Sequence, residues 1–153
     1  MTTYIVNVDG VNVKTSVTDG AFVDSFITEL ALSCNYMNIS SPPLIGLDLI
    51  NMEVVPQSLF NFLSAPVFCF VGVGIVHYSL SLLKRYHGLE CRNVVDLMPF
   101  LKLAVFSGQV GIEPKPLSVL MGDWSAGNLS MEQIESAASD AFTYFEFGKL
   151  FLG

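Results

Sequence analysis

Charged side chains are scarce in this sequence, and basic side chains are the scarcest. The 153 residues include 7 Lys and Arg against 14 Asp and Glu, which gives a net charge of -7. A protein that holds nucleic acid by neutralising phosphates needs an excess of basic residues, so the composition argues against that class. Only Lys84, Arg85 and Arg92 cluster, and such a trio is typical of a solvated helix end that favours the helix dipole.

Cysteine is also rare, with Cys34, Cys69 and Cys91 as its only occurrences. Their odd number and spacing match neither a disulfide framework nor a metal knuckle, so we expect reduced thiols. The first residues lack the basic and then apolar order of a signal peptide. We therefore expect a cytoplasmic or nuclear protein that is not secreted.

Residues 54–83 contain no charged side chain at all. Prolines, glycines and polar residues interrupt this run, so no part of it reaches the roughly twenty apolar residues of a membrane span. We interpret it as core and expect no membrane association. Residues 67–75 are typical of a strand buried on both faces, and a helix over 78–86 should end at Gly88.

Hydrophobic periodicity places the remaining elements around this core. Asp9-Gly10 between two alternating segments predicts a type I′ hairpin, and Ser130 with Gln133 predicts a capping box for the last helix. The other expected helices cover residues 22–32, 56–63 and 97–106, the last capped by Asp96, and the other strands cover 44–51 and 91–95. This alternation indicates one α/β domain over 1–153, with a hairpin and helix in 1–43 and a core in 44–153.

Four segments together resemble a known family. They are Ile45-Gly-Leu-Asp48, Phe70-Val-Gly-Val-Gly-Ile75, Asn93-Val-Val-Asp-Leu97, and Asp123-Trp followed by Leu129-Ser-x-Glu-Gln-Ile-x-x-Ala-Ala-x-Asp140-Ala-Phe. In this order they are similar to the DEDD-type 3′–5′ exonuclease domain of the Werner-syndrome kind, particularly its plant branch. The resemblance covers nearly the whole chain. It implies a ribonuclease-H-like three-layer fold with a mixed sheet, and hydrolysis of nucleic-acid ends by two metal ions.

The same resemblance implies four carboxylates that hold two Mg²⁺ or Mn²⁺ ions and a tyrosine that orients water. Asp48 and Asp140 retain the first and last acid, whereas Ile50 and Tyr78 replace the other two and Ser136 replaces the tyrosine. Two carboxylates cannot neutralise two divalent cations, although they could hold one ion weakly with water. We therefore expect no resident cofactor, and Mg or Mn only if activity remains.

Neighbouring side chains are not expected to restore the lost ligands. Glu53 falls on the opposite face of a continued strand from Asp48, His77 points elsewhere on its helix, and Glu135 faces about 100° away from Ser136. A structural alternative for Asp48 and Asp140 is an inherited fold position, with each carboxylate bonded to backbone or water.

The sequence also departs from the family in length. Only residues 52–55 stand where the family has two further strands, so two strands of the usual sheet should be missing. Residues 44–51 would then form a long apolar edge that exposes Leu49, and such edges invite pairing with another chain. This predicts a homo-oligomer or a complex with a full-length relative.

These observations favour a catalytically degenerate, exonuclease-like protein that acts through protein association. Two alternatives stay open, namely a residual metal-dependent 3′–5′ exonuclease and a module that binds nucleic acid without cleaving it. The second would need a basic groove beyond Lys84, Arg85 and Arg92.

Overall fold

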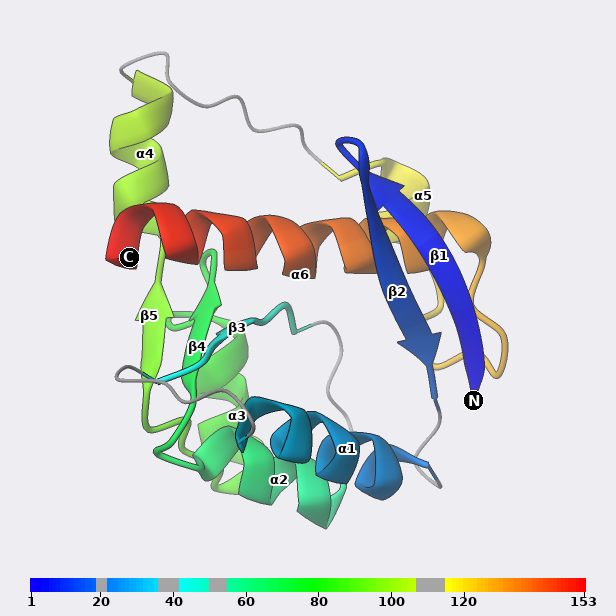
Figure 1. Cartoon of the computed structure of the whole chain (residues 1–153), viewed down its shortest axis with the longest axis horizontal. Coiled ribbons are helices and arrows are strands. Elements are labelled where there is room, and N and C mark those ends of the chain that lie inside the picture. Colours follow the sequence, from blue (N-terminus) through cyan, green and yellow to red (C-terminus); the bar gives the residue numbers. More distant parts are fainter. Residues whose placement is uncertain (19–21, 36–41, 50–54, 107–114) are drawn as a thin grey trace.

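The described part of the chain folds as an α/β protein with two separate sheets and one long helix that crosses both (Figure 1). The computed structural model describes residues 1–18, 22–35, 42–49, 55–106 and 115–153. Its elements are β1 (Thr2–Val8), β2 (Val11–Val17), α1 (Val23–Asn35), β3 (Leu44–Gly46), α2 (Gln57–Ser64), β4 (Cys69–Gly72), α3 (Ser79–His87), β5 (Val94–Asp96), α4 (Met98–Phe106), α5 (Leu117–Leu120) and α6 (Met131–Leu152).

The N-terminal hairpin confirms the turn predicted from Asp9-Gly10. Strands β1 and β2 are antiparallel, and Asp9 and Gly10 have φ values of 49° and 87°. Two successive positive φ angles define the type I′ turn, whose twist matches that of the flanking strands. The Asn7 side chain accepts a hydrogen bond from the Gly10 amide and thereby closes the turn.

The second sheet is parallel, with strand order β3-β4-β5. Its middle strand is buried on both faces, as predicted, because alternate side chains enter different cores. Phe70 packs with Phe62 of α2 and Leu83 of α3, whereas Val71 packs on the other face with Leu97 and with Phe147 of α6. Helices α2 and α3 therefore cover one face of this sheet and α6 covers the other.

The middle strand ends earlier than expected, at Gly72. Beyond it, the Asp96 carboxylate accepts hydrogen bonds from the Gly74 and Val76 amides at 2.9 and 3.2 Å. It also accepts one from the Met98 amide at 2.9 Å, at the start of α4. A single carboxylate thus turns the chain after β4 and, as predicted, caps the next helix.

The long helix α6 joins the two sheets. Ile134 and Ala138 in its first half pack against Val6 and Val8 of the hairpin, and its second half covers the parallel sheet. The predicted capping box is present, since Ser130 and Gln133 exchange side-chain and backbone hydrogen bonds. None of the helices in the described ranges is both long and apolar enough to cross a membrane.

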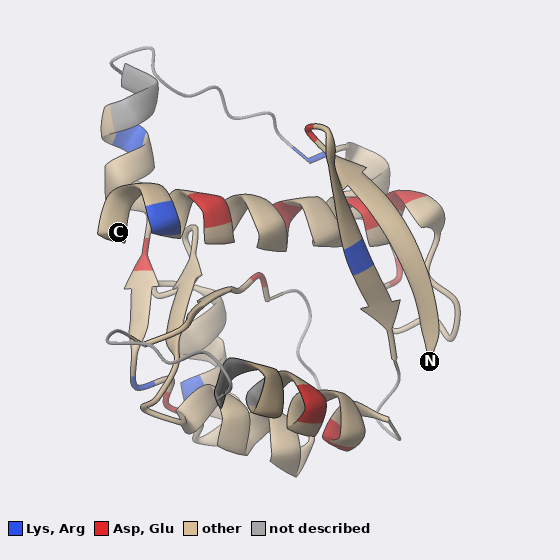
Figure 2. Ribbon diagram, viewed as in Figure 1, with Lys and Arg blue, Asp and Glu red and all other residues tan. Residues whose placement is uncertain are grey.

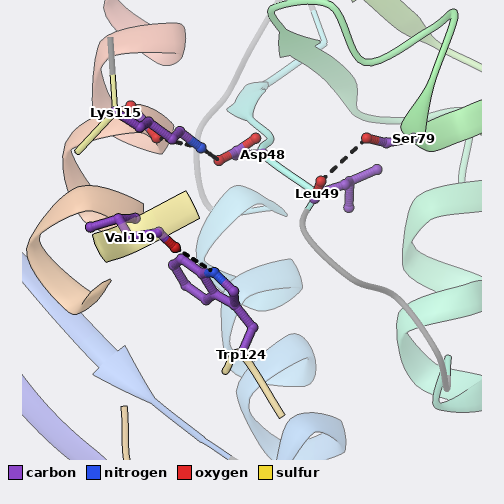
Figure 3. Close-up of polar contacts among 7 residues, drawn as sticks. Asp48, Leu49, Ser79, Lys115, Val119 and Trp124 are labelled. Carbon is purple, nitrogen blue, oxygen red and sulfur yellow. Dashed lines mark hydrogen bonds and ion pairs between the residues drawn. The ribbon is translucent and has the colours of Figure 1, made fainter. Parts of the chain in front are cut away.

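Two expectations about the sheet are corrected. The described strands form one parallel and one antiparallel sheet, rather than a single mixed sheet. Strand β3 is also short, and Leu49 is not exposed on its edge, because its side chain packs against the core formed by α2, β4 and α3. The Leu49 carbonyl accepts a hydrogen bond from Ser79 at 3.2 Å, which draws this segment toward α3 (Figure 3). Residues 50–54 lie outside the described residues.

Candidate functional site

A lysine lies between the two aspartates that the sequence singled out. The Nζ atom of Lys115 donates a hydrogen bond to Oδ2 of Asp48 at 2.8 Å (Figure 3). The same Nζ lies 2.9 Å from Oδ2 of Asp140, as an ion pair that is not aligned as a hydrogen bond. The three side chains are between 16% and 23% exposed, so this cluster is largely shielded from water.

Three distant segments of the chain bring these side chains together. Asp48 follows β3, where the Leu47 amide continues the ladder by donating to the Val71 carbonyl at 2.8 Å. Asp140 lies near the middle of α6, and Gly46 lets β3 approach that helix so closely that a Cβ on Gly46 would collide with the Ala141 backbone. Contact between β3 and α6 thus sets the spacing of the two carboxylates.

Lys115 enters from the segment that begins α5. Pro116 precedes this one-turn helix, and Val119 within it is buried. The Trp124 indole donates a hydrogen bond to the Val119 carbonyl at 3.0 Å, which fixes the end of the turn (Figure 3). Lys115 is therefore attached to an anchored segment, and its ammonium reaches the aspartates from there.

The electrostatics of the cluster favour a charged lysine. Burial by itself lowers the pKa of Lys115, but the hydrogen bond to Asp48 and the negative charges of Asp48 and Asp140 outweigh it and raise that pKa above its ordinary value. Burial raises the pKa of Asp140, and Lys115 opposes this effect. One turn further along α6, burial and the two carboxylates raise the pKa of Tyr144 to about 12. Lys115 therefore stays protonated and cannot act as a base at neutral pH.

The other residues singled out in the sequence lie apart from this cluster or at its margin. Tyr78, at the position of a lost acid, is 71% exposed at the start of α3. Ser136 lies one turn before Asp140, and Glu135 beside it is exposed. His77 is exposed too, whereas Ile50 and Glu53 lie outside the described residues.

A cleft of about 490 Å³ opens beside the cluster. We call it the α6 cleft, and its lining includes Ile5, Lys115, Val119, Glu132, Glu135 and Asp140. Lys115 and Asp140 carry the charges at the cluster, and Glu132 and Glu135 add two acids from the first turns of α6. The cleft is therefore more acidic than the cluster alone.

The residues present do not fit the two-metal centre that the exonuclease resemblance implies. Among the described residues, no group of three or more His, Cys, Asp or Glu side chains could hold a metal ion. The carboxylates of Asp48 and Asp140 both face the Lys115 ammonium group. A divalent cation between the two carboxylates would be repelled at close range by the positive charge of that ammonium. The alternative of an inherited fold position, with each carboxylate bonded to backbone or water, did not include the contact that both make with Lys115.

Lys115 is the residue that sequence reasoning missed. It is 67 residues from Asp48 and 25 from Asp140, so no periodicity connects the three. The available signal was a lone cation between two prolines, Pro114 and Pro116, in a chain with only 7 basic residues. Two facing carboxylates that lack a metal ion require another positive charge nearby, and Lys115 is the residue that supplies it.

Neither a scan against models of known protein families nor a comparison with curated proteins finds a match to this sequence. The exonuclease resemblance therefore stays a prediction that rests on the residue pattern.

Proposed function

We propose that this chain is a non-catalytic protein of ribonuclease-H-like, exonuclease-like ancestry that acts by associating with another protein chain. In this proposal, the Lys115 ammonium has taken the position of a metal ion between Asp48 and Asp140. The observation that carries the proposal is the pair of contacts, at 2.8 and 2.9 Å, from Nζ to the two carboxylates. The parallel order β3-β4-β5 supports the ancestry, since it is the core that the proposed loss of two antiparallel strands would leave.

A lysine can replace the charge of a metal ion but not its chemistry. A divalent metal ion activates water and stabilises the leaving oxygen because both oxygens coordinate to it directly. An ammonium group has no open coordination position, and Lys115 already donates one hydrogen bond to Asp48 while it forms an ion pair with Asp140. Its raised pKa also prevents it from removing a proton from water. Lys115 thus stabilises the remaining carboxylates without supplying a nucleophile.

Association is supported by apolar surface that the described part of the chain leaves open. Leu117, Leu120 and Met121 at α5 are 73%, 58% and 79% exposed, and Tyr78 and Tyr86 of α3 are each 71% exposed. Clusters of exposed large apolar side chains mark interaction surfaces more often than isolated ones do. With hydrophobic residues at 52% of the sequence, the chain can offer more than one such surface.

A second candidate, residual metal-dependent exonuclease activity, is favoured by one observation. Asp48 and Asp140 do converge, and a single Mg²⁺ could bind them with water if Lys115 moved away. Binding of nucleic acid without cleavage has less support, because Lys84, one of its three clustered cations, is already paired with Glu90.

A nuclease assay separates these functions. The protein is incubated with end-labelled single- and double-stranded DNA and RNA in Mg²⁺ or Mn²⁺, next to an Asp48→Ala, Asp140→Ala variant that reports contaminating nuclease. We expect neither protein to shorten any of the labelled substrates. Stepwise 3′ shortening that disappears in the double variant would refute the proposal, and a salt-sensitive mobility shift without shortening would favour nucleic-acid binding instead.

A further inference from the structure

One exposed face of α3 combines aromatic, aliphatic and cationic side chains. We call it the α3 face, and it consists of Tyr78, Leu82, Arg85 and Tyr86. Positions three and four apart share one side of a helix, and the opposite side is buried through Leu80 and Leu83. Tyr78 and Tyr86 are each 71% exposed and Leu82 is 37% exposed. Tyrosine and arginine are enriched among residues that dominate binding energy.

The α3 face is cationic although the whole chain is acidic. Arg85 is exposed and forms no ion pair with any residue in the described ranges. Lys84 and Arg92 beside it are exposed as well, and Lys84 is paired with Glu90. In a chain with net charge -7, this positive surface is complementary to acidic surface on a second copy.

The α6 cleft offers a complement to this face on the same chain. Its Glu132 and Glu135 are exposed, and neither forms an ion pair with another described residue. Apolar side chains accompany these charges. Ile5 lines the cleft and is 65% exposed, and Leu117 comes directly after Pro116, another lining residue. Figure 2 shows acidic segments recurring along α6. The cleft therefore offers both negative charge and apolar surface.

The two surfaces cannot meet within one molecule. Helix α3 packs through Leu83 on the Phe70 face of the parallel sheet, whereas α6 packs on the Val71 face. The α3 face, which points outward from its own layer, is thus separated from α6 by the sheet and α3 itself. For the same reason, one pair of molecules cannot form both contacts at once.

We infer that the α3 face of one copy docks into the α6 cleft of a second copy. Arg85 then pairs with Glu132 and Glu135, while Leu82 and Tyr86 cover apolar surface beside the cleft. Each docked pair leaves one free α3 face and one free cleft, so the assembly is head-to-tail and grows with concentration or closes into a ring. This inference rests on the proposed function, for which it names a second copy as the partner.

The test uses two variants that each remove one surface. The α3-face variant carries Arg85→Glu and Tyr86→Ser, and the cleft variant carries Glu132→Lys and Glu135→Lys. Matched controls change charge elsewhere, with Lys14→Glu on β2 for the first and Asp24→Lys with Glu29→Lys on α1 for the second. All seven altered residues, four in the test variants and three in the controls, are exposed. Circular dichroism verifies folding, and sedimentation velocity follows the mass over a range of concentrations at low and high salt.

We expect the mass of the unaltered protein to rise with concentration and to fall with salt, because the contact is partly electrostatic. Each variant should associate more weakly by a factor on the order of thirty, while the controls behave as the unaltered protein. An equimolar mixture of the two variants should form a dimer and nothing larger, since only one intact face and one intact cleft remain per pair.

Three results would overturn the inference. They are a protein that stays monomeric at every concentration, variants that associate as strongly as the unaltered protein, and a mixture that stays monomeric. The second result leaves association itself intact and excludes only these two surfaces. The proposed function is tested separately, because only 3′ shortening in the nuclease assay would show that the protein is catalytic.

Discussion

Replacing Lys115 with methionine tests whether its ammonium holds the two aspartates together. Methionine keeps the unbranched apolar stem and removes the charge, so Asp48 and Asp140 are left facing each other. The two Oδ2 atoms can be no farther apart than the sum of their contacts to Nζ, at 2.8 and 2.9 Å. At such a separation, two carboxylates repel each other by about 3 kcal/mol at an effective dielectric constant of about 20.

The expected loss lies between the values for exposed and buried ion pairs. Exposed pairs contribute about 0–1 kcal/mol, whereas removing one partner of a buried pair costs about 3–5 kcal/mol. Because these side chains are 16–23% exposed, we expect Lys115→Met to lower the free energy of unfolding by about 2 kcal/mol at pH 7. Urea denaturation should show this as a midpoint lowered by about 1 M.

The loss should depend on pH in a defined direction. In the variant, repulsion raises the pKa of one carboxylate in the folded state, so the folded state binds more protons than the unfolded state. The variant is therefore stabilised as pH falls, and its difference from the unaltered protein shrinks toward pH 5. In the unaltered protein, the raised pKa of Lys115 means that its stabilisation is fully present below pH 10.5 and is lost as pH rises through the higher folded value.

Divalent cations provide a second measurement on the same variant. Without the ammonium, Mg²⁺, Mn²⁺ or Ca²⁺ can bridge the two carboxylates, and a concentration ten times the dissociation constant would add about 1.4 kcal/mol to stability. The unaltered protein should gain nothing specific, because Lys115 occupies the space. Lys149→Met is the matched control, since it removes an exposed pair with Glu146 and should cost no more than about 1 kcal/mol. A Lys115→Met protein as stable as the unaltered one at pH 7 would refute this reasoning, as would an equal loss at pH 5 and pH 7.

Three further predictions concern the fold around the site. Gly46→Ala should lower the free energy of unfolding by about 3 kcal/mol, because its Cβ would collide with the Ala141 backbone; a loss below 1 kcal/mol in urea would contradict this contact. Asp96→Ala should cost about 3 kcal/mol and lower the thermal midpoint, since three backbone amides lose their acceptor, whereas Asp96→Asn should restore part of the loss. Burial raises the pKa of the Cys91 thiol to about 11, so its alkylation at pH 8, followed by mass spectrometry, should be much slower in the folded protein than in urea; equal rates would show an open thiol.

Local features of the fold could be predicted from the sequence because each depends on a few neighbouring residues. The hairpin turn follows from the positive φ angles that Asp9-Gly10 tolerates, and the start of α6 follows from the reciprocal bonds of Ser130 and Gln133. Gly88 ends α3 with a left-handed φ of 66°, as its position predicted. In each case the cause and the structure lie within four residues of each other.

Features that depend on distant contacts could not be predicted in this way. Strand β3 is shorter than its apolar run, because Leu49 turns into the core and its carbonyl bonds to Ser79, 30 residues away. Lys115 contacts residues from two other elements, and only the assembled fold shows that its ammonium lies between them. The family resemblance did imply that Asp48 and Asp140 would converge, but not that a cation would join them.

The position of α6 across both sheets has a consequence for the order in which the chain can fold during synthesis. The hairpin buries Val6 and Val8 mainly against Ile134 and Ala138, and an isolated two-stranded hairpin is at best marginally stable in water. Residues 2–17 are therefore made well before residues 131–152 and must wait for them before their apolar side chains are buried. Until α6 is made, the side chains of Val6 and Val8 stay exposed to solvent in the nascent chain. Any requirement of this protein for chaperones should be greatest in that interval.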